Sequence, residues 1–326
     1  QIEAKIDANF TRKIIDNIIK SPTGQSILAK NLTFYELIRI NENMVKATYI
    51  EGHPSINHPN EKKLFKWTNK LNKEPLTYLN ATKETFIQGL NKNNITWLLI
   101  GNSHGMVLSR CLQDEFKNNY SYFYTFVATG CLPFYVPNNL AFLDPGNQMP
   151  YKFCSSFAKV VKELIENLNP DYLFISFRWY STFKEQQFNK NLIKNDQILN
   201  IFNLFIQQIQ PFIKKKIFFP APHLHYKNKI ARDLARAIWL GVPLEILHLS
   251  YKEHLKNNYW SYQRLNYLNC SKCLIYDFSK IFCNVTTDFC LAFDEENKLA
   301  YYYDDNHLNY LGSEFIRPYI RSLYII

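Results

Sequence analysis

The chain has 326 residues, 47% of them hydrophobic, and a formal net charge of +10. This length and composition fit one large or two small globular domains and exclude a disordered chain. No run approaches the roughly 18 consecutive apolar residues of a membrane-spanning helix. The one dense basic run, Lys214-Lys215-Lys216, is either a solvated strand start or a contact for anionic head groups or acidic glycans. Since no basic helix or stacking motif is present, we expect no nucleic-acid partner.

The first part of the chain carries helical patterns without recognisable chemistry. Apolar residues recur at helical spacing from Phe10 to Ile19 and again from Phe34 to Ile38, and a loop follows over residues 51–63. We predict that residues 1–92 form a helical N-terminal extension and that residues 93–326 form a second domain. Because the chain begins at Gln1 without an initiator methionine, we expect a processed form or a segment of a longer protein.

The second part alternates short apolar runs with helical patterns, which is typical of a parallel sheet covered on both faces. Five runs are predicted as strands: Trp97–Ile100, Tyr122–Val127, Tyr172–Phe177, Ile217–Phe219 and Leu274–Phe278. Helical patterns follow each run, among them residues 231–240 and 243–255, and a last helix is expected from about residue 310. The predicted fold class is therefore α/β: a three-layer α/β/α sandwich with a five-stranded parallel sheet, of the flavodoxin-like kind.

One turn of this predicted sheet presents a serine. Gly101-Asn102-Ser103-His104-Gly105 follows the first strand and enters a helical pattern. A sharp strand-to-helix turn raises the serine at the carboxyl edge of the sheet, beside the first N–H groups of the helix. A serine in this position alone is more often an ordinary helix-start residue than a nucleophile. We expect His104 to pack or cap beneath the turn.

A second motif, Asp304-Asp305-Asn306-His307-Leu308, makes Ser103 a candidate nucleophile. A serine hydroxyl needs a neutral imidazole to take its proton, and the imidazole needs a carboxylate to fix its tautomer. Asp304 and His307, three residues apart before a helix, can face each other. The serine turn also fits the G-x-S-x-G pattern of α/β-hydrolases, but that fold has several strands before its nucleophile and takes acid and base from separate loops.

Cysteines and glycosylation sequons indicate an oxidising compartment, extracellular or lumenal. We expect the disulfides Cys131–Cys154, Cys283–Cys290 and Cys270–Cys273, and a zinc site of the last four cysteines is the alternative. Cys111 shares an apolar helix face and is predicted as a buried thiol outside the disulfides. Asn-x-Ser/Thr sequons exceed the roughly three expected by chance and occur at Asn9, Asn31, Asn80, Asn94, Asn119, Asn269 and Asn284.

These motifs together resemble the SGNH (GDSL-like) hydrolase superfamily over roughly residues 93 to 326. The turn at Ser103 is similar to its first block, and Asp304 to Leu308 is similar to its terminal Asp-x-x-His-Leu block. The similarity is closest to the extracytoplasmic SGNH domain attached to membrane acyltransferases of the third family. In that branch the second block ends in a turn similar to Gly130-Cys131-Leu132-Pro133, and the third strand ends in a pair similar to Arg178-Trp179.

The resemblance implies roles for individual residues. Ser103 would be the nucleophile, His307 the general base and Asp304 its orienting carboxylate, with the oxyanion held by the backbone N–H groups of Ser103 and Gly130. Two positions depart from the superfamily pattern: Asn102 stands where an Asp is usual, and no Asn is evident after the third strand, where Arg178 is a candidate donor. Asn102, Trp179 and Tyr180 are candidates to line the substrate site, although such aromatic residues are more often core or rim residues than sugar platforms.

The implied function is serine-dependent acyl transfer through an acyl-enzyme, without a cofactor or a metal. The protein would be an O-acyltransferase acting on a carbohydrate or lipid hydroxyl, or the corresponding esterase. Its expected partners are an acyl donor, a hydroxyl acceptor and a membrane acyltransferase domain in the same or another chain, which would also tether it to the membrane. The alternative is a catalytically inactive domain that binds a glycan, lipid or protein. His223 and His225, which would face the same side of an extended segment, carry a weaker alternative as metal ligands.

Overall fold

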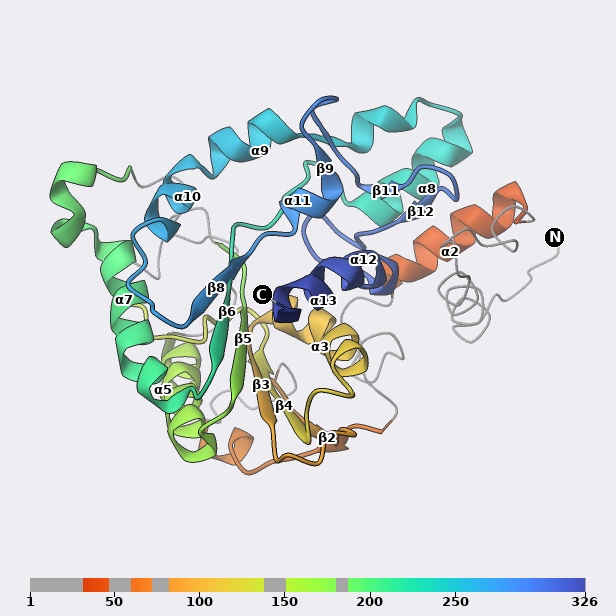
Figure 1. Cartoon of the computed structure of the whole chain (residues 1–326). Coiled ribbons are helices and arrows are strands. Elements are labelled where there is room, and N and C mark those ends of the chain that lie inside the picture. Colours follow the sequence, from red (N-terminus) through yellow and green to blue (C-terminus); the bar gives the residue numbers. More distant parts are fainter. Residues whose placement is uncertain (1–31, 47–59, 72–81, 138–150, 180–186, 326) are drawn as a thin grey trace. The chain divides into compact units, whose positions relative to one another are not determined.

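The computed structural model describes residues 32–46, 60–71, 82–137, 151–179 and 187–325 (Figure 1). The chain forms two compact units, and both are discontinuous in sequence. One unit, the sheet unit, combines residues 60–223, 255–278 and 321–326. The other, the turn unit, combines residues 1–59, 224–254 and 279–320, which include the Asp304–His307 turn.

The sheet unit is built on a mostly parallel sheet that has seven strands within the described residues, in the order β1-β2-β4-β3-β5-β6-β8. β3 is parallel to both β4 and β5, β6 extends the parallel part and β8 closes it, whereas β2 and β1 join the far side antiparallel. The order reverses at β3, which is where ligands of α/β sheets ordinarily bind. The strands are β1 Lys62–Lys63, β2 Thr82–Gln88, β3 Thr96–Gly101, β4 Tyr122–Ala128, β5 Tyr172–Ser176, β6 Lys216–Pro220 and β8 Cys273–Tyr276.

Helices cover both faces of this sheet because side chains alternate along its buried strands. On one face Ile100 shares a buried apolar core with Phe157 and Phe202, which come from α5 (Tyr151–Leu168) and α7 (Gln197–Ile209). On the other face Trp97 stacks on Phe116, at the end of α3 (Ser103–Glu115), with ring centroids 4.3 Å apart. Figure 1 shows α5 and α7 on one side of the sheet and α3 on the other. The predicted three-layer α/β/α arrangement is confirmed.

The prediction of five strands was incomplete, since β1 and β2 come from the part that we expected to be helical. β2 escaped prediction because polar side chains occupy three of its four buried positions, so it shows no apolar alternation. Lys83 is buried with its ammonium 3.0 Å from Glu61 and 2.8 Å from the hydroxyl of Ser109. Glu84 accepts backbone hydrogen bonds from Trp67 and Thr68. Burial of polar groups is tolerated here because each is paired.

The turn unit consists of helices and short antiparallel strands. α2 (Phe34–Lys46) is helical as predicted and packs against α8 (Ile230–Leu240). The predicted helical pattern over residues 243–255 is only partly correct, because a 3-10 helix at Leu244–Leu247 and strand β7 precede α9 (Tyr251–Asn257). The pattern from Phe10 to Ile19 lies outside the described residues. The other elements are β7 Leu249–Ser250, α11 Ser279–Phe282, β9 Cys283–Asn284, β10 Phe289–Cys290, β11 Phe293–Asp294, β12 Leu299–Ala300 and α12 Tyr310–Phe315; α10 (Tyr259–Leu265) belongs to the sheet unit, and α13 spans Arg317–Ile325.

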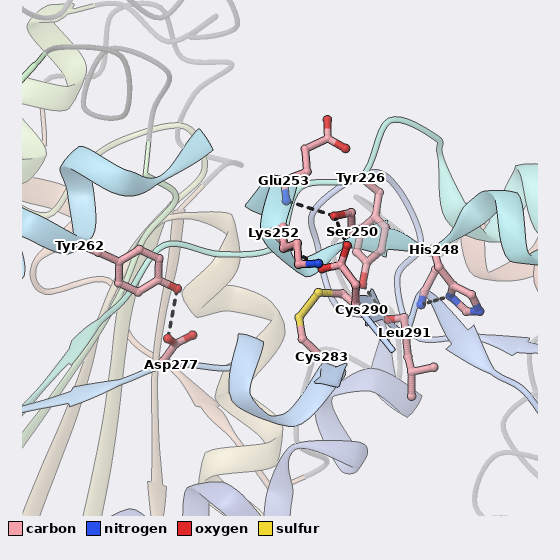
Figure 2. The surroundings of a disulfide bond; sticks show 12 residues. Tyr226, His248, Ser250, Lys252, Glu253, Tyr262, Asp277, Cys283, Cys290 and Leu291 are labelled. Atoms are coloured by element: carbon pink, nitrogen blue, oxygen red, sulfur yellow. Dashed lines mark hydrogen bonds between the residues drawn. A yellow bond between two sulfur atoms is a disulfide. The ribbon is translucent and has the colours of Figure 1, made fainter. Parts of the chain in front are cut away.

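All three predicted disulfides are present: Cys131–Cys154, Cys270–Cys273 and Cys283–Cys290. The last joins two directly paired residues of β9 and β10, beside the hydrogen bond from the Tyr226 hydroxyl to the Leu291 carbonyl (Figure 2). The zinc alternative is excluded because these cysteines offer no thiolates. Cys111 is buried and takes part in none of the three bonds. The disulfides fit an oxidising compartment. Among the described helices, none is long and apolar enough to cross a membrane.

Candidate active site

The turn between β3 and α3 has a backbone that only glycine can adopt at its first position. Gly101 has φ +154°, and a Cβ atom there would lie 1.7 Å from the carbonyl oxygen of Ser176. Asn102 is 1% exposed and acts as the N-cap of α3, its side-chain oxygen accepting the backbone N–H of His104 at 3.1 Å. Asn102 therefore caps the first turn of α3. Ser103 is half-buried between two buried neighbours, at the first position of the helix.

Gly130 and Arg178 follow the strands that flank β3. Gly101 pairs in register with Val127 of β4 and with Ser176 of β5. Gly130 comes three residues after Val127, in a left-handed conformation with φ +72°. Arg178 comes two residues after Ser176, and both Gly130 and Arg178 are half-buried. Because these strands are parallel, the segments that carry Ser103, Gly130 and Arg178 leave the same edge of the sheet.

The residues proposed to line the substrate site are buried where the structure describes them. Trp179 is 1% exposed, and its indole N–H donates to the carbonyl of Pro220 at 3.1 Å. Its ring packs against Phe202, with centroids 5.2 Å apart. Trp179 is therefore a core residue and presents no ring face to a sugar. Asn102 is likewise buried as a helix cap, and Tyr180 lies outside the described residues.

Asp304 and His307 form a hydrogen-bonded pair in the turn before α12. The Asp304 carboxylate accepts the ring Nδ1 of His307 at 2.7 Å with one oxygen. Its other oxygen accepts the backbone N–H groups of His307 at 2.7 Å and Asn306 at 3.0 Å. His307 is 7% exposed, and its ring lies nearly parallel to that of Tyr303, with an interplanar angle of 11°. The predicted contact between acid and base is thus present.

The protonation of this pair follows from its contacts. Burial raises the pKa of Asp304, but the hydrogen bond and charge of the His307 ring and two backbone N–H donors outweigh it, so this pKa lies below its ordinary value. An ionised carboxylate only accepts hydrogen bonds, so Nδ1 of His307 carries a hydrogen. In the neutral ring, Nε2 is then a proton acceptor, as a general base requires.

A second histidine–carboxylate pair adjoins the first, and the sequence did not indicate it. His225 Nε2 lies 2.9 Å from a carboxylate oxygen of Asp305, 80 residues away along the chain. Local sequence patterns do not predict a contact between residues this far apart in the chain. His223, which we considered with His225 as a metal ligand, lies instead against His104, with ring centroids 4.4 Å apart. Among the described residues there is no cluster of three or more His, Cys, Asp or Glu side chains that could hold a metal.

The predicted site residues are thus distributed over both units. Ser103, Gly130 and Arg178 belong to the sheet unit, and Asp304 and His307 belong to the turn unit. His104 is buried beneath the serine turn, as expected.

Comparison with known proteins identifies the family of this chain. The family model described as "SGNH domain (fused to AT3 domains)" matches residues 72–322. The fold is similar to the periplasmic domain of the lipopolysaccharide acetyltransferase of Salmonella ser. Paratyphi A, with a TM-score of 0.54 and 12% identity over 91% of this chain and 99% of that one. A weaker likeness, with a TM-score of 0.37 and 13% identity over 92% of this chain and 100% of the other, is to a putative platelet activating factor from Streptococcus pneumonia. No curated protein sequence matches the chain. The match over most of its length shows that the chain belongs to the family of SGNH domains that are fused to AT3 domains.

Proposed function

We propose that this domain transfers an acyl group through an acyl-enzyme on Ser103, with His307 as general base and Asp304 as its orienting carboxylate. The observation that carries the proposal is the Asp304–His307 pair. Its 2.7 Å hydrogen bond to an ionised carboxylate leaves Nε2 of His307 as the acceptor for a serine proton. Ser103 supports the proposal, because it stands at the start of α3 after a turn that fixes its backbone.

The first half of the reaction forms the acyl-enzyme. His307 Nε2 takes the hydroxyl proton of Ser103 while the serine oxygen attacks the carbonyl carbon of an ester donor. The oxyanion of the tetrahedral intermediate is held by the backbone N–H groups of Ser103 and Gly130. His307 then returns the proton to the departing alcohol.

The second half decides between transferase and esterase. A hydroxyl of a carbohydrate or lipid acceptor gives its proton to His307 and attacks the acyl carbon. His307 then returns this proton to the departing oxygen of Ser103, which gives the free serine and an O-acyl product. Water in the same place gives hydrolysis, so net transfer requires that the site exclude water. In this proposal a fused or associated AT3 membrane domain delivers the acyl group and keeps the domain at the membrane; the fusion of such SGNH domains to AT3 domains supports it.

Arg178 is proposed as a third oxyanion donor. It leaves the strand next to β3, at the same edge as Ser103, and it stands where the superfamily usually has an Asn. A guanidinium adds a fixed positive charge to its N–H donors, so it stabilises an oxyanion more strongly than an amide does. Arg178→Ala is expected to lower the acylation rate by about 10²-fold, in the range seen when one oxyanion donor is removed.

Covalent labelling tests the proposal directly. A fluorophosphonate probe should modify the wild-type protein once, at Ser103, as found by intact mass and peptide mapping. Ser103→Ala and His307→Ala should abolish labelling, whereas Ser271→Ala, which removes an exposed serine of the same unit, should keep it. With an activated ester as donor, the product partition between water and added sugar acceptors then separates esterase from transferase. Exclusive hydrolysis with every acceptor would count against transfer.

The binding alternative has its own supporting observation: Asn102 and Arg178 replace the usual superfamily residues. A domain without chemistry would leave Ser103 unlabelled while Asp304 and His307 keep their hydrogen bond. Binding of the same domain to immobilised glycans or to lipid vesicles would then identify its role.

We also propose that the domain is an N-glycoprotein of an extracellular or lumenal compartment. Asn94, Asn269 and Asn284 are exposed and Asn119 is half-buried, while Asn9, Asn31 and Asn80 lie outside the described residues. Peptide N-glycosidase should increase the electrophoretic mobility of the protein expressed in a secretory host, and Asn284→Gln should remove one step of that shift.

A further inference from the structure

The Asp304–His307 turn contains two adjacent carboxylates, and Asp304 is the one that faces Nδ1 of His307 at 2.7 Å. Asp305 follows Asp304 directly, and its oxygens have other partners: one lies 2.9 Å from Nε2 of His225, and the other accepts the side-chain N–H of Asn306 at 2.7 Å. We propose that His225 is a positioning residue for the Asp304–His307 pair. It would hold Asp305 and the turn backbone so that Asp304 alone orients the imidazole.

The segment that carries His225 is itself well anchored. The residue after it, Tyr226, is 2% exposed, and its hydroxyl donates to the Leu291 carbonyl at 2.6 Å. Figure 2 shows Tyr226 and Leu291 beside the Cys283–Cys290 disulfide. His225 therefore projects from a segment that its neighbour Tyr226 anchors, and its side chain reaches the turn at Asp305.

Two backbone hydrogen bonds join the same segment to the turn. The N–H of Tyr226 donates to the carbonyl of Asp305 at 2.7 Å, and the N–H of Ile230 donates to the carbonyl of Asp304 at 3.2 Å. These bonds set the path of the backbone but do not choose a rotamer for either carboxylate. The side chain of His225 makes that choice for Asp305, because it adds a donor next to the carboxylate and draws it away from other donors.

The pairing of His225 with Asp305 contributes little free energy. The His225 and Asp305 side chains are 43% and 35% exposed, so solvent screens their attraction. Exposed pairs of this kind contribute about 0.2–1 kcal/mol, which corresponds to a change of at most about fivefold in the population of the ordered turn. This factor is large enough to measure at His307, and too small to decide whether the domain folds.

The test observes His307 and does not require catalysis. In the full chain labelled with ¹⁵N-histidine, the Nδ1–H proton bound to Asp304 is assigned by its loss in His307→Gln, and its exchange with water is measured by NMR. His225→Ala should speed this exchange about two- to fivefold. His225→Gln, which keeps an N–H donor at the corresponding position, should restore the wild-type rate. Lys227→Gln is the matched control, because Lys227 lies in the same segment but pairs with Glu253.

A double-mutant cycle gives the second measurement. Asp305→Ala should speed the exchange as His225→Ala does, and the double variant should not add to either single change. Equal exchange in wild type and His225→Ala would overturn the inference, and so would an equal acceleration in Lys227→Gln. If His225→Ala does not fold, His225→Gln and Asp305→Ala decide the question.

The inference rests on the proposed function for its catalytic meaning, and the two can fail separately. In an active enzyme, kcat of His225→Ala should fall by the same factor as the exchange rate rises, with KM unchanged. If Ser103 is not labelled but the exchange responds as described, the acyl-transfer proposal fails and the positioning role of His225 stands. If Ser103 is labelled and the exchange does not respond, the reverse holds.

Discussion

Replacing Asp304 by Asn separates the two tasks of that side chain, which are to hold the turn and to orient His307. The Asn side-chain oxygen can still accept the backbone N–H groups of Asn306 and His307, which Asp304 accepts at 3.0 and 2.7 Å. The amide NH₂ then replaces the carboxylate oxygen that faces Nδ1 of His307 at 2.7 Å. Two N–H groups cannot hydrogen-bond to each other, so the ring must change tautomer or lose this contact.

The magnitude follows from these contacts. The protein loses one charge-assisted hydrogen bond, and we expect the free energy of unfolding to fall by about 1.5–3 kcal/mol. In the alternative tautomer Nε2 of His307 carries the hydrogen and cannot act as a base, so acylation of Ser103 should fall by about three to four orders of magnitude. Asp288→Asn is the control, because the Asp288 carboxylate of the same unit accepts hydrogen bonds from Ser250 and from the backbone N–H of Lys252.

The assay is the rate of fluorophosphonate labelling, together with urea unfolding as a function of pH. The folded-state pKa of Asp304 is lowered, so its contribution to stability is fully present above its unfolded pKa of about 3.9 and is lost as the pH falls through the folded value. The stability difference between wild type and Asp304→Asn should be constant near neutral pH and shrink below about pH 4. Labelling of Asp304→Asn at nearly the wild-type rate would refute the reasoning, and so would an undiminished stability difference in strong acid.

Further substitutions test the fold around the site. Gly101→Ala should lower the free energy of unfolding by more than about 3 kcal/mol and abolish labelling, because its Cβ would lie 1.7 Å from the Ser176 carbonyl oxygen; wild-type melting would contradict this. Lys83→Met leaves the buried carboxylate of Glu61 without its cation and should cost about 3–5 kcal/mol in urea unfolding, with the Glu61→Gln double variant recovering part of the loss. Loss of the Cys131–Cys154 disulfide should cost about 3 kcal/mol and loss of Cys270–Cys273 only about 2, because they close loops with sequence separations of 23 and 3. The opposite order in thermal melts would argue against the chain-entropy account.

Features that depend on residues close together in the chain could be predicted from the sequence. The turn at Gly101 and the cap at Asn102 involve only a few neighbouring residues, so these residue types indicate where α3 begins and place Ser103 at its start. Asp304 and His307 are three residues apart, and a loop of that length brings their side chains together. Apolar runs also marked the five parallel strands, because hydropathy is a local property of the sequence: β3, β5 and β6 are almost entirely buried, and the less buried β8 is still apolar.

Features that depend on residues far apart in the chain were decided only by the tertiary structure. Strand β2 is polar at three of its four buried positions, and partners from other elements make the burial of Lys83 possible. Trp179 at the end of β5 could equally have been exposed, and its hydrogen bond to Pro220 places it in the core. The pairing of His225 with Asp305 spans 80 residues. In each case the free energy comes from long-range contacts, and neither hydropathy patterns nor motif spacing report contacts of that kind.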